Sequence, residues 1–289
     1  MFTKQNLLFP LHLLFILAVF PPIEGFTSSP DYWKGEGYFK NSSSQKEAAG
    51  DLMKHVPFKS NESILDVGCG DGKITAEIAL KYPQSKLVGL DLSPSMIDFA
   101  KKKFSEEQHP NLQFRLLDAQ DLDYKGEFDI ILSFTALQWL KDHDAFLKVA
   151  HASLKDNGIL AITMPLGPPK ALEQAVHEAI AMAEWAPYFK NFETGWNFVD
   201  RDQYAQLLVA NQFSPTRYEI VPQKDVFPSQ ASFEAFLGQI FPYLRALPQD
   251  LKKPFLKQVV DRFIALESFP NGEVHWKFFR LEVVALKSK

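Results

Sequence analysis

The stretch ILDVGCGDGKIT, residues 64–75, constrains the fold more than any other part of this 289-residue chain. A short apolar run leads directly into three glycines at every second position, Gly68, Gly70 and Gly72. Glycine permits a tight turn in the left-handed backbone region, and it allows a ligand to approach the main chain closely. A strand that enters such a turn and continues into a helix is a common cradle for nucleotides. The stretch therefore predicts an α/β protein that binds a nucleotide-containing ligand.

Strands and helices alternate downstream of this turn. Apolar runs predict strands at residues 63–67, 86–92, 112–118, 128–134 and 159–165. Helices are predicted at 73–80, from Pro94 onward with Ser93 as N-cap, and at 145–154. Alternation on this scale indicates a parallel sheet with helices on both faces.

The pattern changes after Pro165. A helix is predicted at 170–185, an aromatic-rich loop follows, and Asp200 is positioned to cap a helix that ends near Gln212. Two final strands are predicted at 216–227 and 275–286, with helices between them. We interpret residues 30–289 as one domain with a ligand-binding core at about 60–165. Helical cap insertions are predicted at about 167–199 and 229–268.

The spacing of the glycines distinguishes between cofactors. The dinucleotide fingerprint is G-x-G-x-x-G, and Lys73 stands where that pattern requires its third glycine. This argues against an NAD-dependent oxidoreductase. The sequence LDVGCGDG instead resembles the first motif of the class I S-adenosylmethionine-dependent methyltransferases. The resemblance implies a Rossmann-like, seven-stranded, mostly parallel sheet with its last strand antiparallel, and S-adenosylmethionine as cofactor.

The resemblance also implies which residues bind that cofactor. Asp66 would orient the methionine end, the glycine turn would pass beneath it, and Asp91 would accept both ribose hydroxyls. Asp118 and Ala119 would contact the adenine, and Met96 would pack on its face. The predicted cofactor-binding residues are Asp66, Gly68, Gly70, Gly72, Asp91, Leu92, Met96, Asp118 and Ala119.

Two further segments bear on the methyl acceptor. The stretch from Ser133 to Pro165, with QWLKDH inside it, resembles the trans-aconitate and insect juvenile hormone acid methyltransferases, which form esters of carboxylates. YFKNSSSQ, residues 38–45, resembles the N-terminal segment of the latter family. This resemblance, which spans about residues 32–165, implies that Tyr38 and Gln45 enter the acceptor pocket. Gln45 and Trp139 are our hypothesised donors to the acceptor oxygen.

A small-molecule carboxylate is the predicted acceptor. Because carboxylates are already ionised at neutral pH, no general base is required, and positioning and exclusion of water suffice. The cap arginines are scattered, which favours a more apolar acid than aconitate. These four are Arg201, Arg217, Arg245 and Arg280.

Several alternatives remain open at this point. An amine, phenol or carbon acceptor would require a base, with Tyr38 or His143 as candidates. A cofactor-binding protein without catalytic activity would have the same motif. The net charge of −4 does not indicate nucleic-acid binding, and the single cysteine, Cys69, excludes an internal disulfide and a cysteine-built zinc site. No metal site is predicted.

The first 29 residues have the layout of a secretory signal. One lysine precedes an apolar run at 7–20, and two prolines and small residues follow it. A cleaved signal, an uncleaved membrane anchor and a start codon assigned too early remain alternatives. Because S-adenosylmethionine is made inside cells, its supply favours the cytoplasm or an anchor whose catalytic domain faces the cytoplasm.

Overall fold

The computed structural model describes residues 31–288, apart from residues 32, 34 and 42, and these form one compact unit. The signal-like or anchor segment predicted at residues 1–29 therefore lies outside the described residues. Within the described part, none of the helices has both the length and the apolar character needed to cross a membrane.

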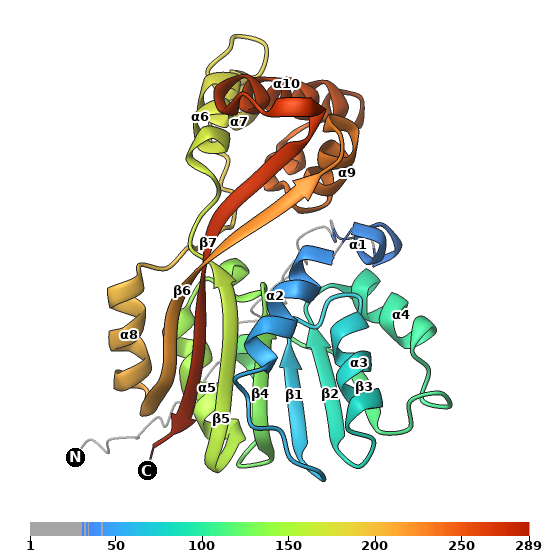
Figure 1. The fold of residues 1–289 in the computed structure, drawn as a ribbon, viewed down its shortest axis with the longest axis vertical. Coiled ribbons are helices and arrows are strands. Elements are labelled where there is room, and N and C mark those ends of the chain that lie inside the picture. Colours follow the sequence, from blue (N-terminus) through green and yellow to red (C-terminus); the bar gives the residue numbers. More distant parts are fainter. Residues whose placement is uncertain (1–30, 32, 34, 42, 289) are drawn as a thin grey trace, which may run out of the picture. The chain divides into compact units, whose positions relative to one another are not determined.

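A seven-stranded sheet forms the centre of this unit, with the strand order β3-β2-β1-β4-β5-β7-β6 (Figure 1). The strands from β1 to β5 pair in parallel, and β7 is antiparallel to both of its neighbours. The strand bounds are β1 Ser63–Val67, β2 Lys86–Asp91, β3 Leu112–Leu116, β4 Phe128–Phe134, β5 Leu154–Pro165, β6 Phe213–Phe227 and β7 Val274–Lys287. The predicted Rossmann-like sheet with an antiparallel last strand is confirmed.

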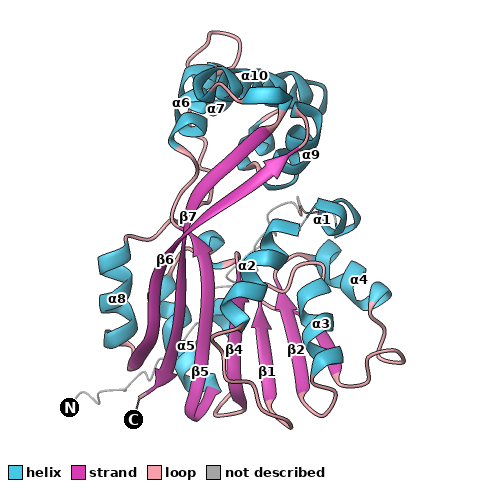
Figure 2. Ribbon diagram, in the orientation of Figure 1, coloured by secondary structure: helices cyan, strands magenta, loops and turns pink. Residues whose placement is uncertain are grey.

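Helices cover both faces of the sheet (Figure 2). Residues alternate between the faces along each strand: Leu65 of β1 packs with α5 and α8, whereas Ile64 packs with α2, α3 and α4. The helices are α1 Gly35–Asn41, α2 Ser43–Met53, α3 Lys73–Lys81, α4 Pro94–Lys103, α5 His143–Ser153, α6 Lys170–Ile180, α7 Ala186–Phe189, α8 Arg201–Ala210, α9 Gln230–Ile240 and α10 Gln249–Glu267. Short 3-10 turns are η1 Ala119–Asp121, η2 Leu137–Trp139, η3 Pro242–Ala246 and η4 Pro270–Gly272.

Side-chain caps explain where several helices begin. Ser93 accepts a hydrogen bond from the Met96 amide, and Pro94 is the first residue of α4, as predicted. Asp142 caps α5, so that helix begins two residues before the predicted start at 145. The helix predicted at 170–185 ends at Ile180, because the chain turns there and the Trp185 amide bonds the Met182 carbonyl.

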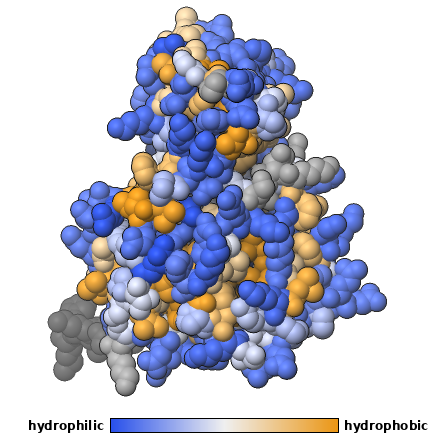
Figure 3. Space-filling view, viewed as in Figure 1, coloured by the Kyte–Doolittle hydropathy of each residue, from blue (hydrophilic) through white to orange (hydrophobic). Residues whose placement is uncertain are grey.

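The helical cap has its own apolar core. The outer parts of β6 and β7 extend past the sheet, and Trp276 of β7 packs among phenylalanines of α9 and α10. Phe233 and Phe263 stack with ring centres 5.4 Å apart inside this cluster. Many of the 26 phenylalanines of the chain are therefore cap core. On the face shown in Figure 3, hydrophilic residues cover most of the cap surface.

Candidate active site

The glycine turn lies where β1 ends and α3 begins. Gly68, Gly70 and Gly72 have φ angles of 74°, 54° and 76°, all in the left-handed region that glycine tolerates best. The amides of Gly68 and Cys69 both donate to the Leu90 carbonyl of β2, at 2.8 and 2.9 Å. A side chain at Gly68 would place its Cβ 2.2 Å from the Cβ of Ala136. The turn is thus held against β2, and there is no space for a larger residue at Gly68.

Asp91 ends β2 and joins two segments of the predicted cofactor site. Its Oδ2 accepts from the Gly70 amide at 2.9 Å, and its Oδ1 accepts from the Ser93 amide at 2.8 Å. Burial raises the pKa of this carboxyl, although both backbone hydrogen bonds oppose the rise. Each carboxylate oxygen has further accepting capacity, so the group can also accept hydroxyl donors of a ligand.

Asp66 lies in β1, two residues before the turn, and is 2% exposed. Its Oδ2 accepts from the Thr75 hydroxyl at 2.6 Å, while its Oδ1 has no partner among the described residues. Burial raises the pKa of Asp66 to about 7, and the charge of Asp91 adds to the rise. An open, buried acceptor beside a cavity fits the ammonium group of a bound amino acid.

Asp66→Asn is expected to stabilise the ligand-free protein above pH 7 and to weaken S-adenosylmethionine binding. Because the folded-state pKa lies above the usual value near 4, the stability that Asp66 contributes is largest below pH 4 and is lost as the pH rises through 7. Calorimetric unfolding should show the variant at least about 3 °C above the wild type at pH 8. The two should converge near pH 4, and an equal difference at both pH values would contradict this account.

The residues predicted at the adenine end follow β2 and β3. Leu92 is 66% exposed, whereas Met96 is 2% exposed, inside α4. The Asp118 side chain accepts from the Gln120 amide at 2.9 Å and caps the 3-10 turn η1, which begins at Ala119. None of these four residues lines either of the two cavities found at this end of the sheet. Their contacts with adenine therefore remain predictions.

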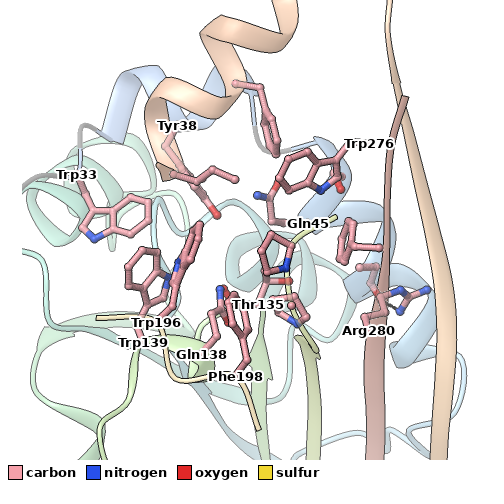
Figure 4. Close-up of a pocket in the computed structure, with 18 residues that line it drawn as sticks. Trp33, Tyr38, Gln45, Thr135, Gln138, Trp139, Trp196, Phe198, Trp276 and Arg280 are labelled. Carbon is pink, nitrogen blue, oxygen red and sulfur yellow. Dashed lines mark hydrogen bonds between the residues drawn. The ribbon is translucent and has the colours of Figure 1, made fainter. Parts of the chain in front are cut away.

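Tyr38 of α1 and Gln45 of α2 line two cavities. Figure 4 shows both residues in the lining of the larger one. The smaller, of about 370 Å³ including the open space at its mouth, is lined by Gly68 and Gly70 of the turn, Asp66 and Lys73. The larger, of about 760 Å³ including the open space at its mouth, extends toward the cap. The structure thus brings the predicted Tyr38 and Gln45 to the boundary between the cavity at the glycine turn and the larger cavity.

Tryptophans form one wall of the larger cavity. Trp139 lies in η2, with Trp33 edge-on at 5.4 Å between ring centres and Trp196 tilted at 5.9 Å. Figure 4 shows the three rings grouped on one side of the space. The Arg245 guanidinium lies 4.9 Å from the centre of the Trp139 ring, which is a cation–π contact. Trp139 therefore reaches the larger cavity but does not line the smaller one.

Arg280 belongs to this cavity, although sequence analysis treated it as one of four scattered arginines. It is 3% exposed, and its guanidinium bonds Glu282, Asp51 at 3.1 Å and Gln223 at 3.1 Å. Glu282 also pairs with Arg217 and Asp51 with Lys54, so three cations share these two carboxylates. An arginine flanked by apolar residues in the strand KFFRLEVVAL was the signal in the sequence that it is buried.

Thr135 was also missed by sequence analysis. It follows β4, lines the larger cavity and has a φ of 55°, which is strained for a β-branched residue. Its amide donates to the Thr163 carbonyl at 2.7 Å. Strained backbone of this kind often occurs at functional sites. The sequence around Thr135 carries no recognisable signal for it.

The other titratable side chains near the site, His143 and Cys69, have features of structural residues. His143 starts α5, packs edge-on against Tyr204 at 5.5 Å and does not line either cavity. Burial lowers its pKa, so its ring is neutral at pH 7. Burial raises the pKa of the Cys69 thiol well above its usual value, which disfavours a nucleophilic role. The described residues contain no cluster of His, Cys, Asp and Glu suited to a metal ion.

A family model described as a methyltransferase domain matches residues 58–212. The chain belongs to this family and is a class I S-adenosylmethionine-dependent methyltransferase, as its glycine motif predicted. It is 24% identical to a putative methyltransferase of Invertebrate iridescent virus 6 over 246 residues, which covers 84% of this chain and 90% of the viral protein.

It is also 35% identical to trans-aconitate 2-methyltransferase of Deinococcus radiodurans over 133 residues. That match covers 46% of this chain and 49% of the relative, so about half of each protein is aligned. A putative methyltransferase structure from Bacillus halodurans has a TM-score of 0.58 at 17% identity, covering 84% of this chain and all of that one. At this identity the structural likeness shows the fold alone.

The smaller cavity fits the methionine half of S-adenosylmethionine. Oδ1 of Asp66 and Oε1 of Gln45 have no partner among the described residues and are available to donors there, and Asp91 bonds the turn at Gly70. At Gly70 the nearest atom to a Cβ position is Cε1 of Tyr38 at 3.8 Å, which leaves the backbone accessible. The bound cofactor supplies an electrophilic methyl group on a sulfonium. The assignment of individual residues to its parts remains our prediction.

Proposed function

We propose that the enzyme methylates the carboxylate of a small, largely apolar acid and produces its methyl ester. One observation carries the proposal. Among the described residues that line the larger cavity there is no Asp, Glu, His or Lys. An acceptor that binds there must therefore bring its own ionised oxygen.

The two ionisable side chains of that lining are poor bases. Burial raises the pKa of Tyr38, and the charges of Asp71 and Asp91 raise it further, so its hydroxyl stays protonated. Arg280 is a permanent cation. An amine would have to lose the proton of its ammonium form before attack, and a phenol or carbon acceptor would have to lose one before or during transfer, whereas a carboxylate with a pKa near 4 is already ionised.

Tyr38 and Gln45 are suited to hold the acceptor oxygen at the boundary between the cavities. A protonated tyrosine hydroxyl and a glutamine amide are neutral donors, which can orient a carboxylate and leave most of its charge on the attacking oxygen. The indole of Trp139 is a third hypothesised donor from the tryptophan wall. In this proposal the enzyme accelerates transfer by bringing the oxygen to about 3 Å from the methyl carbon and excluding water.

The composition of the larger cavity bears on the rest of the acceptor. Apart from Arg280, its walls are mainly aromatic and aliphatic, with Trp276, Phe236 and Ile240 toward the cap. A tricarboxylate would place two more charges in this space. Because Arg280 is the only cation among the described lining residues and already pairs with Glu282 and Asp51, those charges would be poorly compensated. The cavity thus favours an acid with one carboxylate and an apolar body, despite the partial similarity to trans-aconitate 2-methyltransferases.

The proposal can be tested with S-adenosylmethionine labelled in its methyl group and a panel of aromatic, aliphatic and isoprenoid monoacids, with aconitate, amines and phenols for comparison. A methyl ester releases labelled methanol when the product is treated with base, whereas an N-methyl, ether or C-methyl product does not. Base-labile label on monoacids is the expected result. Base-stable label on an amine, phenol or carbon acceptor would overturn it.

Gln45→Ala and Trp139→Phe are each expected to lower kcat about 10-fold or more on the best acid, because each removes a neutral donor to the reacting oxygen. In Trp139→Phe the Kd for S-adenosylmethionine should stay within about threefold of the wild-type value, because Trp139 does not line the smaller cavity. Trp196→Phe is the matched control, since Trp196 lines the same cavity and has no predicted donor role. Full turnover in both test variants would remove these residues from the mechanism.

A further inference from the structure

The side chain of Lys73 connects two parts of the active site. Lys73 is the first residue of α3, directly after Gly72 of the turn. Its Nζ donates to the Phe39 carbonyl of α1 at 2.5 Å and lies 4.1 Å from the centre of the Phe39 ring. Carbonyls in the last turn of a helix lack partners within the helix, and a cation there is favourable. Lys73 therefore caps the C-terminal end of α1 from the cofactor turn.

Helix α1 carries Tyr38 next to the residue that Lys73 holds. The Tyr38 ring lies over the turn, with its Cε1 3.8 Å from a Cβ position at Gly70. The helix is tightly seated, since a Cβ at Gly35 would lie 2.5 Å from Cβ of Phe99 in α4. A small displacement of α1 along the turn would therefore move Tyr38 relative to both cavities.

We propose that Lys73 is a positioning residue that couples the cofactor turn to α1 and thereby sets Tyr38 at the boundary of the acceptor cavity. The lysine occupies the position where a dinucleotide-binding turn has its third glycine. A glycine there would leave α1 without this contact. The inference rests on the proposed function of the two cavities, and it adds a physical connection between them.

A direct contact between Lys73 and the cofactor must be distinguished from the positioning role. Lys73 also lines the smaller cavity, so its ammonium group could contact the carboxylate of the cofactor instead. The two roles differ in what the Lys73→Met substitution changes. Loss of coupling loosens α1 with or without a ligand, whereas loss of a direct contact weakens ligand binding and leaves α1 as it was.

Hydrogen exchange measured by mass spectrometry on the full chain separates the two, with and without S-adenosylhomocysteine. In Lys73→Met, amides of residues 35–41 should exchange about tenfold faster in both states, because α1 opens more readily. Protection of residues 86–92 by the ligand should persist, and Lys73→Arg should restore most of the protection of α1. Lys81→Met is the matched control, because Lys81 ends the same helix and contacts only the Tyr82 ring among the interactions described.

Unchanged exchange in residues 35–41 of Lys73→Met would overturn the proposal, whether or not ligand affinity falls. If that variant does not fold, Lys73→Gln provides the same comparison with a neutral donor in place. Because the ligand is S-adenosylhomocysteine and no acceptor is present, the result does not depend on which acid is methylated. Failure of the carboxylate proposal would appear only in the labelled-methyl experiment.

Discussion

Asp91→Ala is expected to raise the Kd for S-adenosylmethionine by about 100-fold or more. The substitution removes the acceptor for the Gly70 and Ser93 amides, so the turn loses its connection to the end of β2. It also removes the carboxylate predicted to accept the ribose hydroxyls. Hydrogen bonds to a charged group contribute about 1.5–3 kcal/mol each, and two of them account for this change in Kd. Calorimetric titration of the full chain measures it directly.

Asp98→Ala is the matched control for that titration. Asp98 is an exposed carboxylate of α4, seven positions further along the chain. The Asp98→Ala variant should bind S-adenosylmethionine with the wild-type Kd. S-adenosylhomocysteine should bind the wild type, and its Kd should rise in Asp91→Ala as that of S-adenosylmethionine does. NAD should bind neither the wild type nor the variant. Retention of wild-type affinity in Asp91→Ala would show that the cofactor does not use the end of β2.

Gly68→Ala is expected to destabilise the protein by about 3 kcal/mol or more. Alanine at a φ of 74° is strained, and its Cβ would lie 2.2 Å from the Cβ of Ala136. For a domain of this size each kcal/mol lowers the unfolding midpoint by about 2–4 °C, so a fall of about 6–12 °C is expected. Thermal unfolding monitored by circular dichroism gives the value.

The clash and the backbone strain can be separated with a second substitution. Ala136→Gly removes the opposing methyl group, so Gly68→Ala combined with Ala136→Gly should regain about 1–3 kcal/mol, the part due to overpacking. The part of the free energy of unfolding that is not regained measures the cost of placing alanine at the left-handed φ of residue 68. Ala136→Gly alone provides the reference. If the double variant unfolds at the same temperature as Gly68→Ala, the contact between these two residues is not the cause.

Local sequence signals account for most of the core. The strand bounds at 63–67 and 128–134 coincide with β1 and β4, and the Ser93 cap with Pro94 places the start of α4. These predictions succeed because apolar strands and caps depend on residues close together in the chain. The predicted end of the helix at 185 is wrong, since the turn after Ile180 depends on packing of Trp185 against α10 of the cap.

The sequence by itself determined the class of enzyme, because the glycine spacing, the acid in β1 and the acid that ends β2 are local patterns. Only the tertiary structure decided what faces the acceptor. Arg280 reaches the cavity wall from β7, and its charge is balanced by Asp51, more than 200 positions earlier. Lys73 reaches α1 across 34 positions. Such contacts form when distant elements pack together, and no periodicity or spacing in the chain encodes them.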